Sequence, residues 1–307
     1  MNDGAPFGTI AIVGLGLIGG SIGLAVQQAL PAVRLTGFDA DPDVRCRAQT
    51  RTLVHQVTGT LELAIRDADL VILCVPVRAM GDIAAQMAGV LKPEAIISDA
   101  GSSKAFVADA IRAALPHQPL VPAHPVAGTE RSGPEAGFAG LFRNRWCIIT
   151  PPDGTDPEHV SAVSALWHAL GARVEIMDAA HHDLVLAVTS HVPHLIAYTI
   201  VGTASDLEEV TRNEVITYSA GGFRDFTRIA ASDPTMWRDV FLSNKHAVLD
   251  ILQRFSEDLT ALQRAIRWDD GDALHAHFAK TRGIRRSIID EGQDDARPDF
   301  GRADHSA

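Results

Sequence analysis

The feature that most constrains the fold lies near the start of the chain, where residues 9–14 read TIAIVG and residues 15–29 read LGLIGGSIGLAVQQA. The first run is continuously apolar, as expected for a strand buried on both faces of a sheet. The second run has a helical pattern and begins among glycines. A buried strand followed at once by a helix predicts a strand–helix–strand unit of a parallel sheet.

The turn between this strand and helix carries glycines in the spacing Gly14-x-Gly16-x-x-Gly19. In this context the first glycine permits a tight turn, the second lets a pyrophosphate approach the backbone, and the third allows close helix–strand packing. Phosphates would then bind at the helix N-terminus, beside Leu17 and Ile18. The alternative is a glycine-rich turn with no ligand.

An acidic residue follows at the expected distance, because Asp39 comes 20 residues after Gly19 and ends the predicted strand at residues 34–39. A carboxylate there can accept hydrogen bonds from the ribose hydroxyls of NAD and would repel the 2′-phosphate of NADP. The sequence therefore favours NAD. NADP is kept as an alternative because Asp41 and Arg45 follow closely.

Short β-branched runs and helical stretches alternate from residue 1 to about residue 178, which predicts a Rossmann-like, parallel, doubly wound α/β sheet. Further strands are predicted at residues 68–76, 94–100, 118–123, 145–151 and 172–178, with helices that include residues 77–91 and 157–171.

The pattern becomes entirely helical after residue 179, and helical periodicity continues over residues 233–266. A helix this long is expected to pack against a partner subunit. We predict a dinucleotide-binding domain over 1–178, a helical substrate and dimerisation domain over 179–290, and a disordered tail over 291–307.

The formal net charge of −11 argues against nucleic acid or an anionic membrane as a partner. The three cysteines are scattered, which indicates a reducing compartment without disulfides. The first residues do not resemble a signal peptide, and no run approaches eighteen unbroken apolar residues. These features predict a cytoplasmic protein that does not span a membrane.

Further candidate residues lie at the carboxyl ends of the predicted strands, where ligands bind in such sheets. Val75 and Pro76 end one strand and would border the cofactor. The catalytic candidates are Ser102, which follows the next strand, and His124, which comes directly after the strand at 118–123. A neutral imidazole at His124 could take a proton from a substrate hydroxyl. The alternatives are a structural histidine and a helix N-cap at Ser102 or Ser103.

Ser190, His191 and His194 lie within an apolar helical pattern that Pro193 is expected to bend. We predict no metal site, because the stretch has no HExxH motif, no nearby cysteine and no clear third ligand. The alternative is a set of core histidines that bond to backbone carbonyls.

Arg224 and Arg228 are four residues apart, so a helix would place them on one face. Such a pair suits a substrate carboxylate. The alternative is a surface pair that bridges Asp225 or Asp239.

Five segments occur in the order GLGLIGGS, DAGSSK, HPVAGTE, HHDLVLAVTSHVPH and GGFRDFTRIAASDPTMWRD. Together they resemble the prephenate/arogenate (cyclohexadienyl) dehydrogenases of tyrosine biosynthesis, over about residues 8–290. The resemblance implies a nucleotide-binding domain, an all-helical domain that forms a homodimer, and NAD(P)-dependent oxidative decarboxylation. In that reaction prephenate gives 4-hydroxyphenylpyruvate and arogenate gives tyrosine.

The resemblance also implies roles for individual residues. His124 would accept the proton of the ring hydroxyl, and Ser102 would orient the hydroxyl and the imidazole. Ser190, His191 and His194 would line the substrate pocket, with His194 the contact for the side-chain carboxylate.

Three further residues match the family pattern. Arg228 would bind a substrate carboxylate, Glu130 would lie at the pocket mouth, and Trp237 would be an aromatic neighbour of the site. The family's usual GSVK is GSSK here, so the acting serine is either Ser102 or Ser103.

Two other readings fit parts of the sequence. A two-domain 3-hydroxy-acid dehydrogenase would use a lysine on the first helix of its second domain, but residues 179–244 contain no lysine. A non-catalytic NAD-sensing protein would not need the catalytic residues. The sequence leaves open the choice between prephenate and arogenate, and also inhibition by tyrosine.

Overall fold

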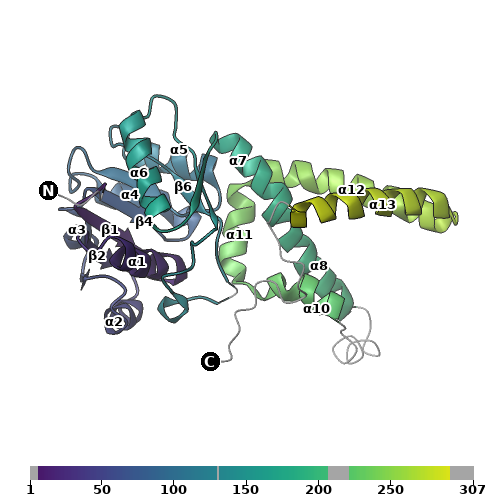
Figure 1. Ribbon diagram of the computed structural model, residues 1–307, viewed down its shortest axis with the longest axis horizontal. Helices are drawn as coiled ribbons and strands as arrows, with labels where there is room; N and C mark the ends of the chain where they lie inside the picture. The colour runs from purple at the N-terminus through teal and green to yellow at the C-terminus, as the bar shows by residue number, and fades with distance from the viewer. Residues whose placement is uncertain (1–5, 130, 207–220, 291–307) are drawn as a thin grey trace. The chain divides into compact units, whose positions relative to one another are not determined.

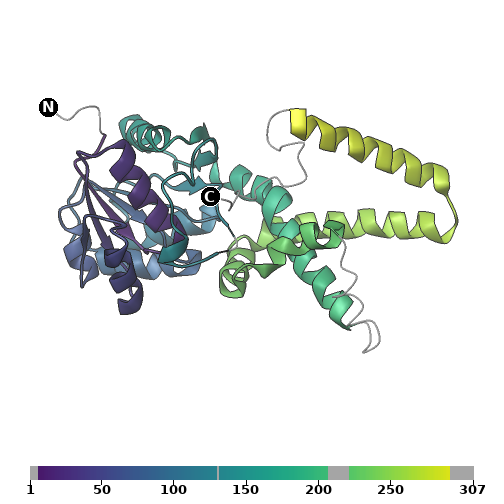
Figure 2. The same ribbon diagram turned by 60° about the horizontal axis from the view of Figure 1, so that its bottom comes forward.

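The computed structural model describes residues 6–129, 131–206 and 221–290 (Figures 1 and 2). Its first part alternates strands and helices, as predicted. The strands are β1 (Thr9–Val13), β2 (Arg34–Phe38), β3 (Gln56–Val57), β4 (Leu70–Leu73), β5 (Ile96–Asp99), β6 (Ala123–Pro125), β7 (Trp146–Ile149) and β8 (Arg173–Ile176). The helices between them are α1 (Leu17–Ala29), α2 (Pro42–Thr50), α3 (Leu61–Ile65), η1 (Val77–Ala79), α4 (Met80–Met87), α5 (Lys104–Ala114), η2 (Pro134–Ala136) and α6 (Pro157–Ala169).

The main sheet has the order β3-β2-β1-β4-β5, and all of its strands are parallel. The chain moves outward from β1 through β2 to β3, then returns to the other side of β1 for β4 and β5. The order therefore reverses between β1 and β4. Ligands of such sheets bind beyond the carboxyl ends of the strands at this reversal point.

Strand β1 is buried on both faces, as its apolar run predicted. Ile10 and Ile12 belong to one hydrophobic core, which includes Ile22 of α1. Ala11 and Val13 point the other way into a second core, against α3, α4 and α5. This alternation follows from the two-residue period of a strand. Fully burying each large aliphatic side chain contributes about 1.5–3 kcal/mol.

A second, three-stranded sheet has the order β6-β7-β8, and the sequence analysis had not separated these strands from the main parallel sheet. Strand β7 runs parallel to β8 but antiparallel to β6. The predicted strand at 118–123 is also displaced, because regular pairing covers only Ala123–Pro125. Pro119 and Pro122 cannot donate to a ladder, which limits pairing before Ala123. His124 consequently lies within β6, opposite Ile148, and not after the strand.

The second part is helical, as predicted. It contains α7 (Ala179–Leu186), the π-helical turn η3 (Ala187–His191), α8 (Val192–Asp206), α10 (Gly221–Thr227), η4 (Arg228–Ala231), α11 (Pro234–Ser243), α12 (Lys245–Arg267) and α13 (Gly271–Asp290). The single helix expected over 233–266 was wrong, because the helix breaks at Asn244.

A bend was predicted at Pro193, and the structure shows a change of helix type just before it. It lacks an N–H group and its ring would clash with the carbonyl of Thr189, so a regular α-helix cannot pass through this point. The structure places the π-helical turn η3 directly before α8. Such turns are frequent at functional sites.

The helical run Ala179–Asp206 is long enough to cross a membrane and contains an 18-residue stretch with a mean hydropathy of 1.6, which the sequence prediction had not allowed for. Length and composition alone support that reading. The same run buries the polar side chains of His182, Asp183 and His191 within the protein. A core helix of a soluble protein passes the same test.

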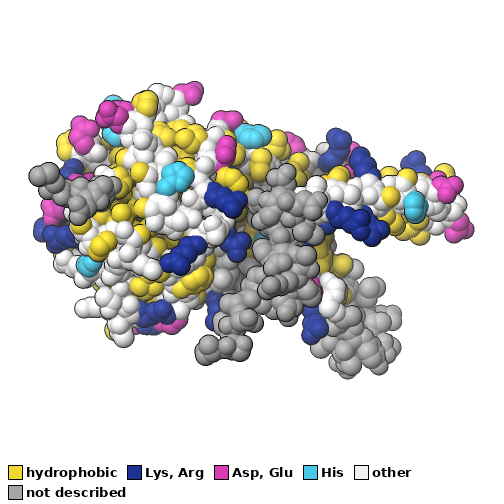
Figure 3. All heavy atoms as spheres, in the orientation of Figure 1, with side chains coloured by type: hydrophobic (Ala, Val, Ile, Leu, Met, Phe, Trp, Pro, Cys, Tyr) yellow, Lys and Arg dark blue, Asp and Glu magenta, His cyan; other side chains and the backbone are white. Residues whose placement is uncertain are grey.

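The chain forms two compact units, Met1–Leu249 and Asp250–Ala307. The first unit contains both sheets and the helices α7 to α11. In the second unit, apolar side chains of α12 and α13 reach the surface (Figure 3). The most exposed of them are Leu259, Ile266, Phe278 and Ile284, and Trp268 in the turn between the two helices is also exposed. The predicted tail at 291–307 lies outside the described residues.

Candidate active site

The glycine turn after β1 is shaped by two close backbone approaches. Gly14 has φ +96°, and a Cβ added there would lie 2.6 Å from the carbonyl oxygen of Cys74, at the end of β4. A Cβ on Gly19 would lie 1.9 Å from the carbonyl oxygen of Gly14. Only glycine fits either position, so the first and third glycines have the roles expected of them.

The middle of the turn is open. Gly16, Leu17 and Ile18 are half-exposed between fully buried neighbours, and a Cβ on Gly16 would meet no atom within 4 Å. Gly16 is the N-cap of α1, and no side chain bonds to the N–H groups of the first turn. This N-terminus can receive a pyrophosphate, because its N–H groups and the helix dipole both favour an anion.

Asp39 lies beside this turn. Its Oδ2 accepts a 2.9 Å hydrogen bond from the N–H of Leu15, and its Oδ1 accepts one of 3.0 Å from the N–H of Asp41. Arg45 donates to the carbonyl of Asp39 at 2.6 Å, and its guanidinium lies over the ring of Phe38. The carboxylate is therefore held rigidly at the carboxyl end of β2, where a dinucleotide ribose would bind.

The end of β4 completes this edge. The backbone nitrogen of Val75 would lie 3.1 Å from a Cβ on Gly14, and Pro76 is the N-cap of η1. All the predicted cofactor residues therefore lie at the carboxyl ends of β1, β2 and β4. Together they fit a dinucleotide.

A chain of buried polar groups begins at His124. Its Nδ1 lies 2.8 Å from Nε2 of His182 on α7, and Nδ1 of His182 lies 2.8 Å from Oδ1 of Asp183. His124 is 8% exposed and His182 is fully buried, so these contacts exclude water. Strand β6 and helix α7 are thereby joined through their histidines.

Asp183 also closes the N-terminus of α5. Its Oδ1 accepts from the N–H of Lys104 at 2.7 Å, and its Oδ2 accepts from the N–H of Ala105 at 3.0 Å. Of the alternative reading as a helix N-cap at Ser102 or Ser103, the structure bears out only the position: Ser103 is the N-cap residue but does not cap with its side chain. Its hydroxyl accepts a hydrogen bond from Ser243 at 2.9 Å.

Lys104 is fully buried next to His124. Its ammonium group bonds to Asp99 and also donates at 2.8 Å to the carbonyl of Ala123. Burial lowers the pKa of Lys104 and raises the pKa of Asp99, while the ion pair between them opposes both shifts. The pair fixes the strand position immediately before His124.

The protein environment keeps both His124 and His182 uncharged. Burial is the main reason that the pKa of His124 lies well below its ordinary value, and His182 and Lys104 lower it further. Burial also lowers the pKa of His182, although its hydrogen bond to Asp183 opposes the shift. Neutral imidazole is the form of His124 that can accept a proton.

His191 is held by Asn244, the residue at the break between α11 and α12. The amide nitrogen of Asn244 donates at 2.7 Å to the carbonyl of Asp183 and lies 3.1 Å from Nδ1 of His191. Because the carbonyl can only accept, this bond fixes the amide orientation, and Nδ1 of His191 is an acceptor. Its proton is then on Nε2, which is buried without a partner among the described residues. Burial lowers the pKa of His191 to about 4.

His194 and Trp237 form a stacked pair with ring centroids 3.7 Å apart. Nδ1 of His194 bonds to the carbonyl of Ser190 at 2.8 Å, which leaves Nε2 for another partner. Burial lowers the pKa of His194, and the positive charge of Arg228 lowers it further. Trp237 also lies edge-on to His191 at 6.1 Å.

The sequence matches two models of one protein family, which together cover most of the chain. A model described as the nucleotide-binding domain of prephenate dehydrogenase matches residues 22–176, and one described as the dimerization domain of prephenate dehydrogenase matches residues 178–280. The chain belongs to the prephenate dehydrogenase family. The family, the fold class and the class of enzyme, a nucleotide-dependent dehydrogenase, are therefore as predicted.

Individual relatives are similar over nearly their whole length. A cyclohexadienyl dehydrogenase of Zymomonas mobilis is 45% identical over 92% of this chain and 96% of its own. The crystal structure of prephenate dehydrogenase from A. aeolicus in complex with hydroxyphenyl propionate and NAD+ is 32% identical, with a TM-score of 0.85 over 91% of this chain and 98% of that one. The Synechocystis arogenate dehydrogenase structure is 26% identical, with a TM-score of 0.78 over 91% of this chain and 99% of that one.

The structure groups most of the residues predicted for this dehydrogenase. Ser190, His191, His194, Arg228 and Trp237 come from η3, α8, η4 and α11 and form one neighbourhood. Ser102 is half-buried between β5 and α5, and among the described residues no hydrogen bond joins it to His124. Glu130 lies outside the described residues.

Four residues of the network were not predicted: His182, Asp183, Asn244 and Lys104. The segment HHD at residues 181–183 carried a signal, because a histidine and an aspartate in the first turn of an apolar helix must bury polar groups. Among the described residues, no group of three or more His, Cys, Asp or Glu side chains is placed to hold a metal ion.

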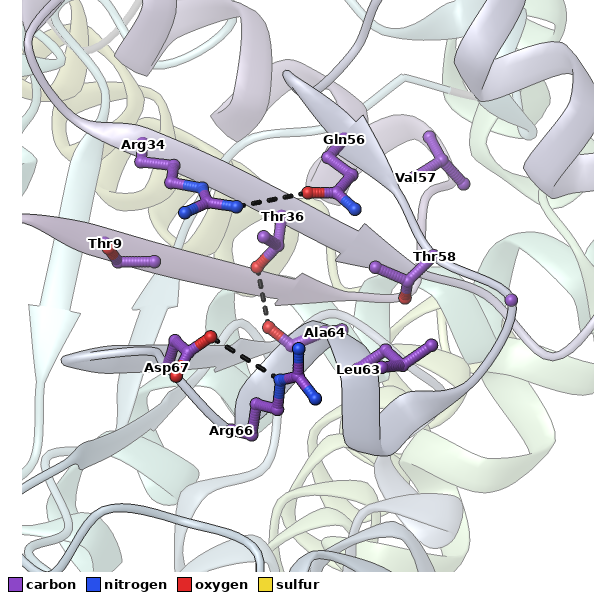
Figure 4. A pocket seen from close by; sticks show the side chains of 11 residues that line it. Thr9, Arg34, Thr36, Gln56, Val57, Thr58, Leu63, Ala64, Arg66 and Asp67 are labelled. Atoms are coloured by element: carbon purple, nitrogen blue, oxygen red, sulfur yellow. Dashed lines mark hydrogen bonds and ion pairs between the residues drawn. The ribbon is translucent and has the colours of Figure 1, made fainter.

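A cavity of about 210 Å³ lies elsewhere, beside the edge strand β3 (Figure 4). Its lining includes Thr9 and Arg34, the first residues of β1 and β2, so it lies at the amino ends of the strands. Arg34 bonds there to Gln56, and Thr36 bonds to the carbonyl of Ala64. Dinucleotides bind at the opposite edge, so this cavity has no part in the site.

Proposed function

We propose that this chain catalyses the NAD-dependent oxidative decarboxylation of prephenate, arogenate or both. The observation that carries the proposal is the buried, uncharged His124, bonded through His182 to Asp183 at the carboxyl edge of a dinucleotide-binding sheet. A family member with a proton acceptor in this position has the group that oxidation of a ring hydroxyl requires.

His124 is the proposed proton acceptor. Its Nδ1 is engaged with His182, so Nε2 is the atom that receives the proton of the substrate hydroxyl. As this proton leaves, the hydroxyl-bearing carbon can release hydride, and the carboxylate on the opposite ring carbon departs as carbon dioxide. Ser102 is proposed to orient the hydroxyl, because Ser103 is engaged with Ser243.

Cationic and polar groups of the helical part are proposed to hold the substrate carboxylates. Arg228 supplies a permanent positive charge, which a chain of net charge −11 must provide locally for an anionic substrate. His194 offers Nε2, and its stacking on Trp237 fixes the ring. His191 offers a buried N–H at Nε2. Glu130 is proposed to lie at the pocket mouth.

The proposed cofactor contacts are Gly14, Gly16, Leu17, Ile18, Gly19, Asp39, Val75 and Pro76. Gly16 and the first turn of α1 would hold the pyrophosphate, and Asp39 would accept from the adenosine ribose. When bound, NAD+ supplies the hydride acceptor. Asp39 favours NAD over NADP, because a carboxylate repels a 2′-phosphate.

We propose domains at 1–178 and 179–290, a cytoplasmic location, and a homodimer formed through the C-terminal helices. The family's dimerization domain covers residues 178–280, which supports the dimer and the boundary. Exposed Trp268 and Phe278 on the segment that contains α12 and α13 are of the kind that interfaces bury.

The test is to mix the purified protein separately with prephenate and with arogenate, each with NAD+ and with NADP+, and to follow formation of reduced nicotinamide. Turnover of at least one substrate supports the proposal, and the four rates give the preferences. Folded protein that binds NAD+ but turns over neither substrate would overturn it in favour of an NAD-sensing protein.

A further inference from the structure

The hydrogen bonds that link His124, His182 and Asp183 have a defined donor and acceptor at each step, which can be worked out starting from Asp183. Oδ1 and Oδ2 of Asp183 each accept a backbone N–H from the first turn of α5. Both oxygens are therefore hydrogen-bond acceptors. The contact between Oδ1 and Nδ1 of His182 must then have the proton on nitrogen.

The proton positions follow along the chain. His182 is neutral with its proton on Nδ1, so its Nε2 has a free lone pair. That lone pair lies 2.8 Å from Nδ1 of His124, which must therefore carry the proton in this contact. A neutral His124 with a proton on Nδ1 has its lone pair on Nε2.

We infer that His182 and Asp183 are positioning residues of the dehydrogenase, which fix His124 in the tautomer whose Nε2 can accept the substrate proton. The inference rests on the proposed role of His124. An isolated imidazole exchanges between two neutral tautomers, and one of them would present an N–H to the substrate hydroxyl. The buried chain excludes that form, because Nδ1 of His124 would then face another lone pair.

The chain also fixes the ring orientation. Lys104 donates to the carbonyl of Ala123, and Asn244 donates to the carbonyl of Asp183, so the backbone on both sides of the histidine contact is held. Outer groups that orient metal-binding histidines change activity about 10-fold to 100-fold when they are removed, and we expect an effect of this size here.

The first measurement is of proton positions in the protein without cofactor or substrate. Two-dimensional ¹⁵N–¹H spectra that detect the imidazole nitrogens would be recorded at neutral pH, with His124→Asn and His182→Phe used to assign the signals. We expect a protonated Nδ1 and a bare Nε2 on His124, and a protonated Nδ1 on His182. A wild-type His124 with its proton on Nε2 would overturn the inference.

The second measurement is of kinetics in matched variants. His182→Phe keeps an aromatic ring but removes both nitrogens, and should lower kcat about 10-fold to 100-fold with little change in KM. His182→Gln places an amide oxygen where Nε2 was and should recover most of the loss. His181→Phe changes the exposed neighbour and should leave kcat unchanged.

The two proposals fail in different ways. A His182→Phe enzyme with wild-type kcat would overturn the positioning role, whatever the spectra show. An absence of turnover by the wild-type protein would overturn the proposed function, while the spectra would still decide the tautomer.

Discussion

Nδ1 of His124 lies 2.8 Å from Nε2 of His182, and this contact joins β6 of the nucleotide-binding part to the first helix of the helical part. The two residues are 58 positions apart in the chain. The position of the His124 ring therefore depends on the correct packing of α7 against β6 and α5. Asp183 supplies that docking, because its carboxylate closes the N-terminus of α5.

The two glycines of the nucleotide turn should respond differently to alanine. Gly19→Ala would place a Cβ 1.9 Å from a backbone oxygen, so we expect lower stability by about 1–3 kcal/mol. Gly16→Ala meets no protein atom within 4 Å, so its melting temperature should stay near that of the wild type. Its dissociation constant for NAD+ should rise roughly tenfold or more. Calorimetry and NAD+ titration measure both effects; unchanged NAD+ affinity in Gly16→Ala would remove the pyrophosphate from this turn.

Asp39→Asn should change the cofactor preference. Loss of a charged hydrogen-bond acceptor costs about 1.5–3 kcal/mol, so kcat/KM with NAD+ should fall about 10-fold to 150-fold. The value with NADP+ should fall much less, because repulsion of the 2′-phosphate is also lost. Asp43→Asn, which removes a carboxylate from the exposed surface of α2, is the control. An unaltered ratio between the cofactors would show that Asp39 does not contact the ribose.

Arg228→Ala should chiefly raise KM for the substrate. A charged hydrogen bond to a carboxylate is worth about 1.5–3 kcal/mol, which corresponds to a KM increase of about 10-fold to 150-fold. Steady-state kinetics with saturating NAD+ give the value, and Arg112→Ala on the exposed face of α5 should match the wild type. If KM stays the same, another group binds the carboxylate.

Stability should fall as the pH is lowered from 7 towards 4. His191 has its ordinary pKa near 6.5 in the unfolded chain and a pKa of about 4 when folded, so the unfolded state binds the proton first. Above pH 6.5, His191 is neutral in both states and does not lower the free energy of unfolding. Below pH 6.5 the unfolded state is protonated first, so the free energy of unfolding decreases progressively, by a total of roughly 3 kcal/mol near pH 4. His124, His182 and His194 shift in the same direction.

Urea unfolding at several pH values measures this dependence. In His191→Phe the free energy of unfolding should change less with pH between 4 and 6.5 than in the wild type. The difference in slope should correspond to the one proton that His191 takes up when the wild type unfolds. The comparison of slopes does not depend on the absolute stability of the variant. Equal slopes would mean that His191 titrates normally in the folded protein.

Sequence reasoning succeeded where the information is local. The strand at 9–13, the glycine turn and Asp39 follow from residue types within a short stretch, and the structure places them as expected. The antiparallel pairing of β6 with β7 could not be predicted, because an apolar run does not indicate in which direction a strand pairs with its neighbour. The break at Asn244 was hidden because Val240 and Val248 on either side of it continue the helical period.

The polar chain behind His124 was hidden for a different reason. A local serine was the alternative reading for the cap of α5, whereas the cap comes from Asp183, which is 79 residues from Lys104. A cap supplied from another helix leaves no local pattern. Only the segment HHD indicated that polar groups are buried where α7 begins.

The most direct test of the account is the turnover of His124→Asn with saturating substrate and NAD+, beside the wild type and His117→Asn, which changes an exposed histidine. If His124 accepts the substrate proton, kcat should fall by roughly 10²–10⁴ while the protein stays folded and binds NAD+. His117→Asn should retain wild-type activity. A loss of less than tenfold in His124→Asn would contradict the account, because the proton would then be accepted elsewhere.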